Sequence, residues 1–176
     1  MTAAKTMITR RVELERFSVI SSKRFEAVVS DFRASVARPD LAEFMRASKA
    51  ARTVDELEGA IQERVGSVGL MLFLELDLGE YLRKETGLDS PKIMRFLIGN
   101  PLIMKEMAKH VSDAGSYAPV TVLIDERADG VHLTYDKMAS LLAPYGSPKA
   151  LAVARELDAK ITSLLQRVAT PARNTD

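Results

Sequence analysis

Two β-rich segments in the second half of the chain are separated by so short a connection that they are expected to pair. The segments are residues 119–126 and 131–136, and Ala128-Asp129-Gly130 joins them. An Asp-Gly pair between two such segments is typical of a tight β-hairpin, whose strands run antiparallel. At least part of the sheet is therefore antiparallel, which argues against a doubly wound parallel fold.

Three further segments have strand patterns. Residues 12–19 form an imperfect one, and residues 92–98 a clearer one. Residues 70–76 are almost continuously apolar, which is typical of a strand covered on both faces, so we expect this strand at the centre of the sheet. With the helical patterns between them, the order is β-α-α-α-β-α-β-α-β-β-α-α. We predict an α+β fold with a mixed or antiparallel sheet of about five strands and helices packed on it.

Capping residues mark the expected starts of several helices. Ser21 and Ser22 can cap the helix that follows the first strand. Pro39-Asp40 starts a second helical segment, because proline suits a first helical turn. Thr53 begins the capping box Thr53-Val54-Asp55-Glu56, which predicts a third helix.

Length and composition are those of one folded domain. The chain has 176 residues, of which 47% are hydrophobic and 28% charged, so it can bury a core without a second domain. We expect a single domain over residues 12–168, with polar, disordered tails at residues 1–11 and 169–176. No cysteine is present, which excludes disulfides, a thiolate nucleophile and cysteine-bound metal.

The charge balance and the apolar runs exclude several classes of partner. The 25 Lys and Arg residues oppose 24 Asp and Glu residues, a formal charge of +1, which gives no field for holding nucleic acid. No apolar run approaches the roughly 18 residues that cross a bilayer, and the N-terminus lacks the apolar segment of a secretory signal. We therefore expect a cytoplasmic protein with no nucleic-acid or membrane partner. No nucleotide motif occurs, and no cofactor is expected.

The last helical pattern, residues 148–168, carries an apolar seam over about four turns. The seam residues recur at steps of three and four: Ala154, Leu157, Ile161, Leu164 and Val168. The sheet of the same subunit or a second copy of the chain can cover such a seam. We expect a homodimer whose association depends partly on this helix.

Four segments within residues 69–136 form a recognisable set: the strand Phe73-Leu74-Glu75-Leu76-Asp77, the following Leu82-Arg83-Lys84-Glu85-Thr86-Gly87, the strand end Gly99-Asn100-Pro101, and Gly115 shortly before Pro119-Val120-Thr121-Val122. In these segments the chain resembles a family of small α+β proteins known as domain of unknown function 302. The resemblance implies a compact α/β sandwich that commonly self-associates, and no established reaction. Relative to that family, residues 38–64 are expected to be a helical insertion.

Two carboxylates form the first candidate site. Glu75 and Asp77 stand two residues apart on a strand, so their side chains are expected to share a face, toward which Met71 and Phe73 also point. Neighbouring carboxylates can divide the acid and base roles of catalysis when their surroundings separate their pKa values. The structural alternative is that Asp77 caps the next helix and that Glu75 lies near the sheet margin or pairs with Arg95.

A strand-to-helix turn forms the second candidate site. Gly99-Asn100-Pro101 follows a strand and opens a helix, so free backbone N–H groups and the positive end of the helix dipole can receive a carboxylate or phosphate. The structural alternative is a tight turn with Asn100 as the cap and Pro101 in the first helical turn. Met104, one turn further on, completes the ligand-binding candidates with Glu75, Asp77, Gly99 and Asn100.

His110 and His132 are the only imidazoles in the chain. Neither has a local ligand motif, so we expect no metal site and a surface position for each. A metal or haem site would require the two histidines to meet carboxylates or Met104 and Met107.

These observations support three hypotheses. The preferred one is a domain that binds a small, partly apolar molecule in a pocket between the sheet and its helices. The second is an enzyme that uses Glu75 or Asp77 as general acid or base on a small anionic substrate, with the Asn100 turn as the anion site. That enzyme requires a raised carboxyl pKa inside a closed pocket. The third is a structural module that acts through contacts between copies.

Overall fold

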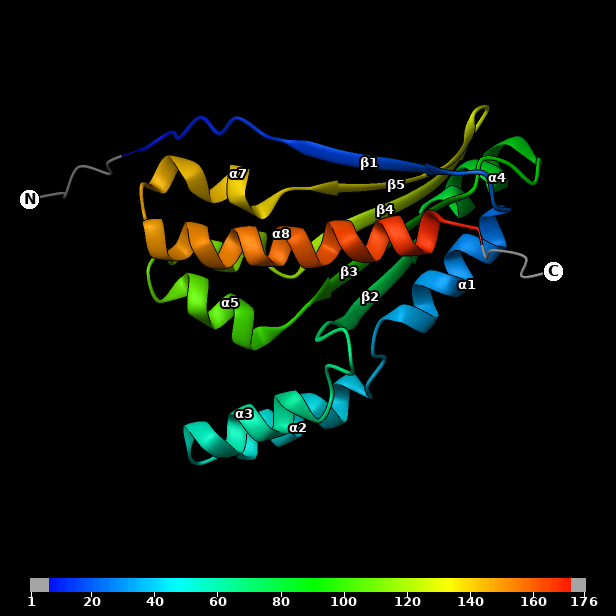
Figure 1. Ribbon diagram of the computed structural model, residues 1–176. Helices are drawn as coiled ribbons and strands as arrows, with labels where there is room; N and C mark the ends of the chain where they lie inside the picture. The colour runs from blue at the N-terminus through cyan, green and yellow to red at the C-terminus, as the bar shows by residue number, and fades with distance from the viewer. Residues whose placement is uncertain (1–6, 172–176) are drawn as a thin grey trace, which may run out of the picture.

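An open sheet with antiparallel neighbours runs through the structure (Figure 1). The computed structural model describes residues 7–171. Across the sheet the strands are ordered β1-β5-β4-β3-β2. Their bounds are β1 Arg16–Ser21, β2 Met71–Asp77, β3 Ile93–Gly99, β4 Val120–Arg127 and β5 Gly130–Asp136. The predicted α+β class with a five-stranded antiparallel sheet is confirmed.

The strands β4 and β5 form the predicted hairpin. Arg127 faces Gly130 at its end, and Gly130 has a φ of +137°, which a residue with a side chain rarely adopts. A Cβ atom at Gly130 would also lie 2.8 Å from the carbonyl oxygen of Ser21. Glycine is therefore required both by the turn and by the close approach of β1.

The strand β2 lies at the edge of the sheet, so its predicted central position is wrong. A register shift between Leu72 and Leu74 makes Phe73 a bulge. Leu74 is 44% exposed and Leu76 is 37% exposed. The strand is therefore not covered on both faces along its whole length. Met71, before the bulge, is fully buried, whereas Leu74 and Leu76, after it, are exposed.

The ends of the domain differ slightly from the prediction. The first strand begins at Arg16 and not at residue 12. The expected disordered tails, residues 1–11 and 169–176, lie largely outside the described part of the chain. Ala169, the last residue of the final helix, is buried.

Eight α-helices and one 3-10 helix connect or cover the strands within residues 7–171. The helices of the first half are α1 Phe25–Ser35, α2 Leu41–Ala50, α3 Val54–Gln62 and α4 Gly79–Thr86. Those of the second half are α5 Pro101–Ala108, α6 Ala114–Tyr117, α7 Met138–Leu142, the 3-10 helix Ala143–Tyr145 and α8 Pro148–Ala169. Helices α2 and α3 are the segments expected near residues 38–64, and in Figure 1 they form an arm below the sheet; we call them the helical arm.

Side-chain caps begin four of these helices. The capping residues accept hydrogen bonds from first-turn N–H groups and are Asp40, Thr53, Asn100 and Ser147. The predicted caps Ser21 and Ser22 are wrong, because α1 begins at Phe25 without a side-chain cap. Ser21 instead donates through Oγ to the carbonyl oxygen of Ala169 at 2.7 Å.

The long helix α8 is covered by its own subunit. It packs against α1, α5, α7 and the strands β1 and β5, and Figure 1 shows it lying along the sheet. The residues of the predicted seam are at most 3% exposed: Ala154, Leu157, Ile161, Leu164 and Val168. This seam is part of the subunit core, so α8 does not offer the surface that we expected to join two copies.

The opposite face of the sheet, which we call the bare face, carries a mixture of polar and apolar side chains. Alternation along the strands sends Val122 and Ile124 into the core, whereas Thr121 and Leu123 point to the bare face. Ile20 on β1 is 50% exposed there. The sheet is therefore covered by helices mainly on one face, and on the other face the helical arm buries Met71 at the start of β2.

Candidate functional site

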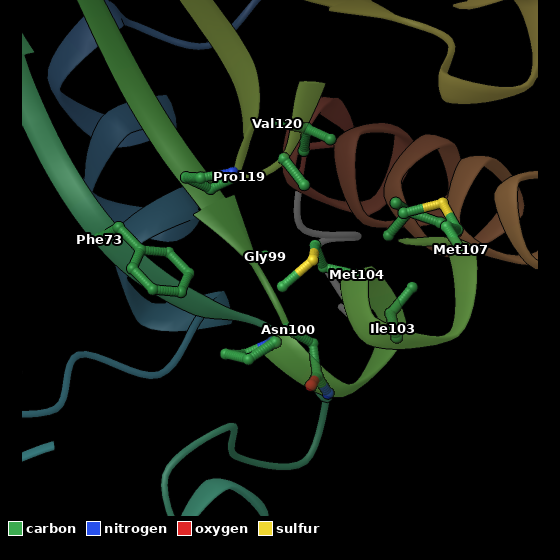
Figure 2. A pocket seen from close by; sticks show the side chains of 11 residues that line it. Phe73, Gly99, Asn100, Ile103, Met104, Met107, Pro119 and Val120 are labelled. Carbon is green, nitrogen blue, oxygen red and sulfur yellow. The ribbon is translucent and has the colours of Figure 1, made fainter. Parts of the chain in front are cut away.

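An apolar pocket lies where β3 ends and α5 begins (Figure 2). It has a volume of about 140 Å³. Six of the residues that line it are Phe73, Gly99, Met104, Met107, Pro119 and Leu157. Because these come from β2, β3, α5, the segment before β4, and α8, the pocket exists only in the folded chain; we call it the Gly99 pocket.

Asn100 fixes the turn beside the pocket with both ends of its amide. Its Oδ1 accepts a hydrogen bond from the N–H of Leu102 at 2.9 Å, and its Nδ2 donates to the carbonyl oxygen of Gly69 at 3.0 Å. Pro101 follows in the first turn of α5. The predicted cap is confirmed, and it also ties α5 to the segment before β2.

Gly99 leaves space that a side chain would enter. A Cβ atom built there would lie 3.5 Å from Cβ of Pro119 and 3.6 Å from Cε2 of Phe73, which are ordinary contacts. Both neighbours line the same pocket. An alanine therefore fits at residue 99, whereas a larger side chain would fill part of the pocket.

The floor of the Gly99 pocket belongs to the core. Met107 is fully buried and Leu157 is 3% exposed, while Met104 on the same helix is half-buried. In Figure 2 the side chains of Met104 and Ile103 extend from α5 near the end of β3. A rigid floor beneath a flexible methionine wall suits an apolar ligand, because methionine adapts its shape at little cost.

Glu75 and Asp77 do not line the Gly99 pocket. The register shift at Phe73 places Glu75 opposite Phe96, whereas Met71 lies opposite Gly99. Residues directly opposite each other share a face, so Glu75 and Met71 are on different faces. Glu75 and Asp77 share a face as predicted, since they lie opposite Phe96 and Met94, but Met71 does not share it, because the bulge interrupts the alternation that the sequence pattern assumes.

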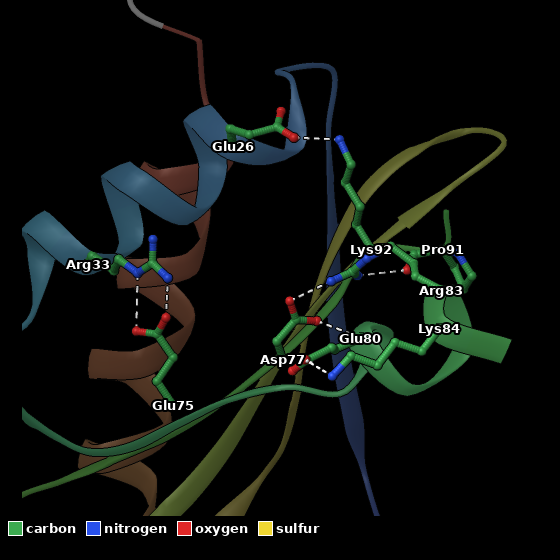
Figure 3. Close-up of polar contacts among 9 residues, drawn as sticks. All are labelled: Glu26, Arg33, Glu75, Asp77, Glu80, Arg83, Lys84, Pro91 and Lys92. Atoms are coloured by element: carbon green, nitrogen blue, oxygen red, sulfur yellow. Dashed lines mark hydrogen bonds and ion pairs between the residues drawn. The ribbon is translucent and has the colours of Figure 1, made fainter. Parts of the chain in front are cut away.

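Each of the two carboxylates has an arginine partner (Figure 3). The Nε of Arg33 lies 3.1 Å from Oε2 of Glu75, and a second contact makes the pair bidentate. The Nη2 of Arg83 lies 2.7 Å from Oδ2 of Asp77. The predicted pairing of Glu75 with Arg95 is therefore wrong, because Glu75 lies opposite Phe96 on the core side of the sheet, where it meets Arg33 of α1, whereas Arg95 projects from the bare face.

Asp77 also stabilises the start of α4. Its Oδ1 accepts a hydrogen bond from the N–H of Glu80 at 3.0 Å, as the structural alternative predicts. Hydrogen bonding to Arg83 is the main cause that holds the pKa of Asp77 below its ordinary value. A general acid at neutral pH needs the opposite shift, so the surroundings of Asp77 are those of a structural ion pair.

The two histidines stay apart from the candidate site. His132 is buried, against our expectation of a surface position, and its Nε2 lies 2.8 Å from Oδ1 of Asp129. His110 is exposed after the end of α5. Within residues 7–171, no group of three or more histidine and carboxylate side chains is placed to hold a metal ion.

Three of the five ligand-binding candidates meet at one place. Gly99, Asn100 and Met104 line the pocket, whereas Glu75 and Asp77 belong to ion pairs. Sequence reasoning did not assign Phe73 or Pro119 to the site. No local signal marks them, because a bulge and the pairing of distant strands bring them there.

The comparisons with known proteins agree with this fold. A family model described as "Domain of unknown function DUF302" matches residues 44–168. The crystal structure of an uncharacterized conserved DUF302 protein from Bacillus stearothermophilus is similar, with a TM-score of 0.61 and 16% sequence identity. The similarity covers 87% of this chain and 97% of that one. No curated protein matches the sequence. Among the described residues, no helix is long and apolar enough to span a membrane.

Proposed function

Because the chain belongs to the DUF302 family, whose description assigns no function, we propose a function from the site itself: the domain binds a small, partly apolar molecule in the Gly99 pocket. The observation that carries this proposal is an apolar space bounded by five separate parts of the chain. Small-molecule sites in proteins are concave and mostly apolar, with a small number of polar groups. The Gly99 pocket is suited to a ligand because it is apolar and because Met104, which lines it, has a flexible side chain.

The size and lining of the pocket define the ligand class. Its volume of about 140 Å³ is close to that of an engineered apolar cavity of about 150 Å³ that binds benzene or xenon. Asn100 contributes the one polar side chain among the lining residues. Its amide retains a second N–H beyond the bond to Gly69. These features favour a compact apolar molecule with a single hydrogen-bonding group.

The lining supports binding rather than acid-base catalysis. No Asp, Glu, His or Lys residue lines the Gly99 pocket, and general acid-base catalysis needs a titratable group within hydrogen-bond reach of the substrate. Glu75 and Asp77, the groups that the enzyme hypothesis assigns, are held by Arg33 and Arg83. The binding hypothesis therefore needs fewer additional assumptions than the enzyme hypothesis.

Methyl NMR of methionine tests the proposal on the full-length protein, with toluene as the probe. Met104 and Met107 line the pocket, whereas Met138 is buried between other elements and serves as an internal control. We expect toluene to shift the methyl signals of Met104 and Met107 saturably and to leave Met138 unchanged. Absence of saturable shifts at Met104 and Met107 would refute the proposal.

A filling variant adds a second test. Gly99→Val places two methyl groups toward Phe73 and Pro119, so it should abolish toluene binding while the protein remains folded. The matched control is Gly59→Val on the exposed side of α3, where a Cβ atom meets nothing within 4 Å. Toluene binding that survives Gly99→Val would place the probe elsewhere in the molecule.

A further inference from the structure

A second concave site lies on the bare face, across four of the five strands. Its volume is about 350 Å³. The residues that define it include three arginines and three hydroxyl side chains: Arg16, Arg95, Arg127, Ser18, Thr121 and Thr134. We call it the Arg95 hollow. It shares no lining residue with the Gly99 pocket.

The strand register explains how these groups meet. Arg95 on β3 lies opposite Leu123 on β4, Leu123 lies opposite Thr134 on β5, and Thr134 lies opposite Ser18 on β1. Residues that face each other across antiparallel strands project from the same side of the sheet. One row of the bare face therefore runs from a guanidinium group over a leucine to two hydroxyl groups.

Two of the three arginines are neutralised by carboxylates. Arg16 binds Asp136 through two bonds, with Nε 2.6 Å from Oδ1 and Nη2 2.9 Å from Oδ2. Arg127 binds Asp125 in the same bidentate way. These pairs fix the positions of two guanidinium groups at the sides of the hollow.

Arg95 is the exception. Its Nη2 donates to Oγ1 of Thr121 at 3.2 Å, and it forms no ion pair with any carboxylate among the described residues. A guanidinium group has five N–H donors, so four of those of Arg95 are not used within the part of the chain that the structure describes. With three arginines and two carboxylates, the hollow has a net charge of +1.

The hydroxyl groups add further donors at the floor. Oγ of Ser18 and Oγ1 of Thr134 lie 3.1 Å apart and share one hydrogen bond, and Thr134 is only 8% exposed. Leu123 lies between these hydroxyl groups and Arg95. The hollow thus combines a cation with unused donors, polar groups held in place by the sheet, and an apolar surface.

We propose that the Arg95 hollow binds the oxyanion group of a small organic anion, a phosphate ester or a carboxylate, with the organic part over Leu123. The fork of Arg95 donates two parallel hydrogen bonds to two oxygen atoms of the anion, the arrangement in which arginine binds such groups most specifically. The site is independent of the Gly99 pocket, so neither proposal requires the other.

Titration with phenyl phosphate tests this assignment. Binding to the full-length protein is measured by calorimetry and by the NMR signal of the Nε–H group of Arg95. We expect Arg95→Gln to weaken binding at least tenfold and Arg95→Lys to weaken it less, because lysine keeps the charge but loses the fork. The control Arg46→Gln removes an exposed arginine from α2 and should change affinity less than twofold.

Two comparisons complete the test. Benzoate should bind at the same signal and compete with phenyl phosphate, whereas benzyl alcohol, which lacks the anion, should not bind there. The proposal is overturned if the Arg95 signal does not move at saturation, or if Arg46→Gln weakens binding as much as Arg95→Gln. The latter result would show attraction to surface charge in general. Toluene binding at Met104 does not bear on either outcome.

Discussion

Asn100 has two structural roles: its side chain caps helix α5, and it also bonds to Gly69, which is 31 positions earlier in the chain. Asn100→Ala removes both the cap on Leu102 and the bond to Gly69. We expect a loss of about 1 to 2 kcal/mol in the free energy of unfolding. Urea denaturation measures it, and Asn100→Ser is the control, because serine keeps a capping oxygen and loses the bond to Gly69. A midpoint unchanged by Asn100→Ala would contradict this assignment.

The ion pair between Asp77 and Arg83 should make a pH-dependent contribution to the stability of the protein. Its pKa is lowered in the folded protein, chiefly by Arg83, so its stabilising effect is complete above the unfolded-state value of about 3.9 and is lost as the pH falls through the folded-state value. Asp77→Asn should therefore reduce the free energy of unfolding at pH 6 and have a smaller effect at pH 2.5. In an Arg83→Gln background the difference between the two pH values should shrink. An equal effect of Asp77→Asn at both pH values would exclude the ion pair as its cause.

The helix caps could be predicted from the sequence, whereas the ion-pair partner of Glu75 could not. The caps Thr53 and Asn100 depend on backbone groups two or three positions away, so a local pattern was sufficient. The partner of Glu75 is Arg33, 42 positions earlier. No local pattern contains that information, because packing of α1 on the sheet decides which arginine reaches the carboxylate.

Strand β2 was predicted correctly as a strand, but its predicted place at the centre of the sheet was wrong, because it lies at the edge. The apolar pattern predicted the strand itself, but the bulge at Phe73 has no signal that hydrophobicity can reveal. The bulge puts Met71 on the other face from Glu75 and Asp77, which the alternating pattern does not predict. The pattern at the β3–α5 turn predicted Gly99, Asn100 and Met104 of the pocket. Phe73, Pro119 and Leu157 come from elements whose positions depend on the whole fold, so no local pattern predicted them.

Helix α8 should contribute strongly to the stability of the folded subunit, because its apolar side is buried. Ile161 is fully buried against the rest of the subunit, so Ile161→Ala should lower the free energy of unfolding by about 2 to 5 kcal/mol. The control Gln166→Ala lies on the exposed side of the same helix and should change it by less than about 0.5 kcal/mol. The measurement is chemical denaturation at fixed protein concentration. A folded Ile161→Ala protein of unchanged stability would show that α8 is not part of the core.

At the scale of the whole molecule, the expected homodimer stays a prediction, and the helical arm offers a surface for it. Met45, which is 69% exposed, lines an apolar groove of about 510 Å³ between the arm and α5, and Val54, elsewhere on the arm, is 63% exposed. Clustered exposed apolar side chains are typical of association surfaces. Native mass spectrometry should show a dimer, and Met45→Glu combined with Val54→Glu should give a folded monomer.

The matched control for the arm is Leu88→Glu. Leu88 is 66% exposed but lies outside the arm, beyond the end of α4, so its substitution should leave the dimer intact. A wild-type protein that is monomeric at every concentration would contradict the expected dimer. A dimer that persists in the double variant would place the interface elsewhere.

The proposed ligand site is the space at the junction of β3, α5 and α8. A crystal pressurised with xenon tests it most directly, because xenon enters apolar cavities of about this size and is located by its anomalous scattering. We expect a xenon atom between Phe73, Met104 and Met107 in the wild-type protein and none at that place in Gly99→Val. Xenon bound elsewhere in the wild-type crystal, with no density beside Gly99, would contradict it.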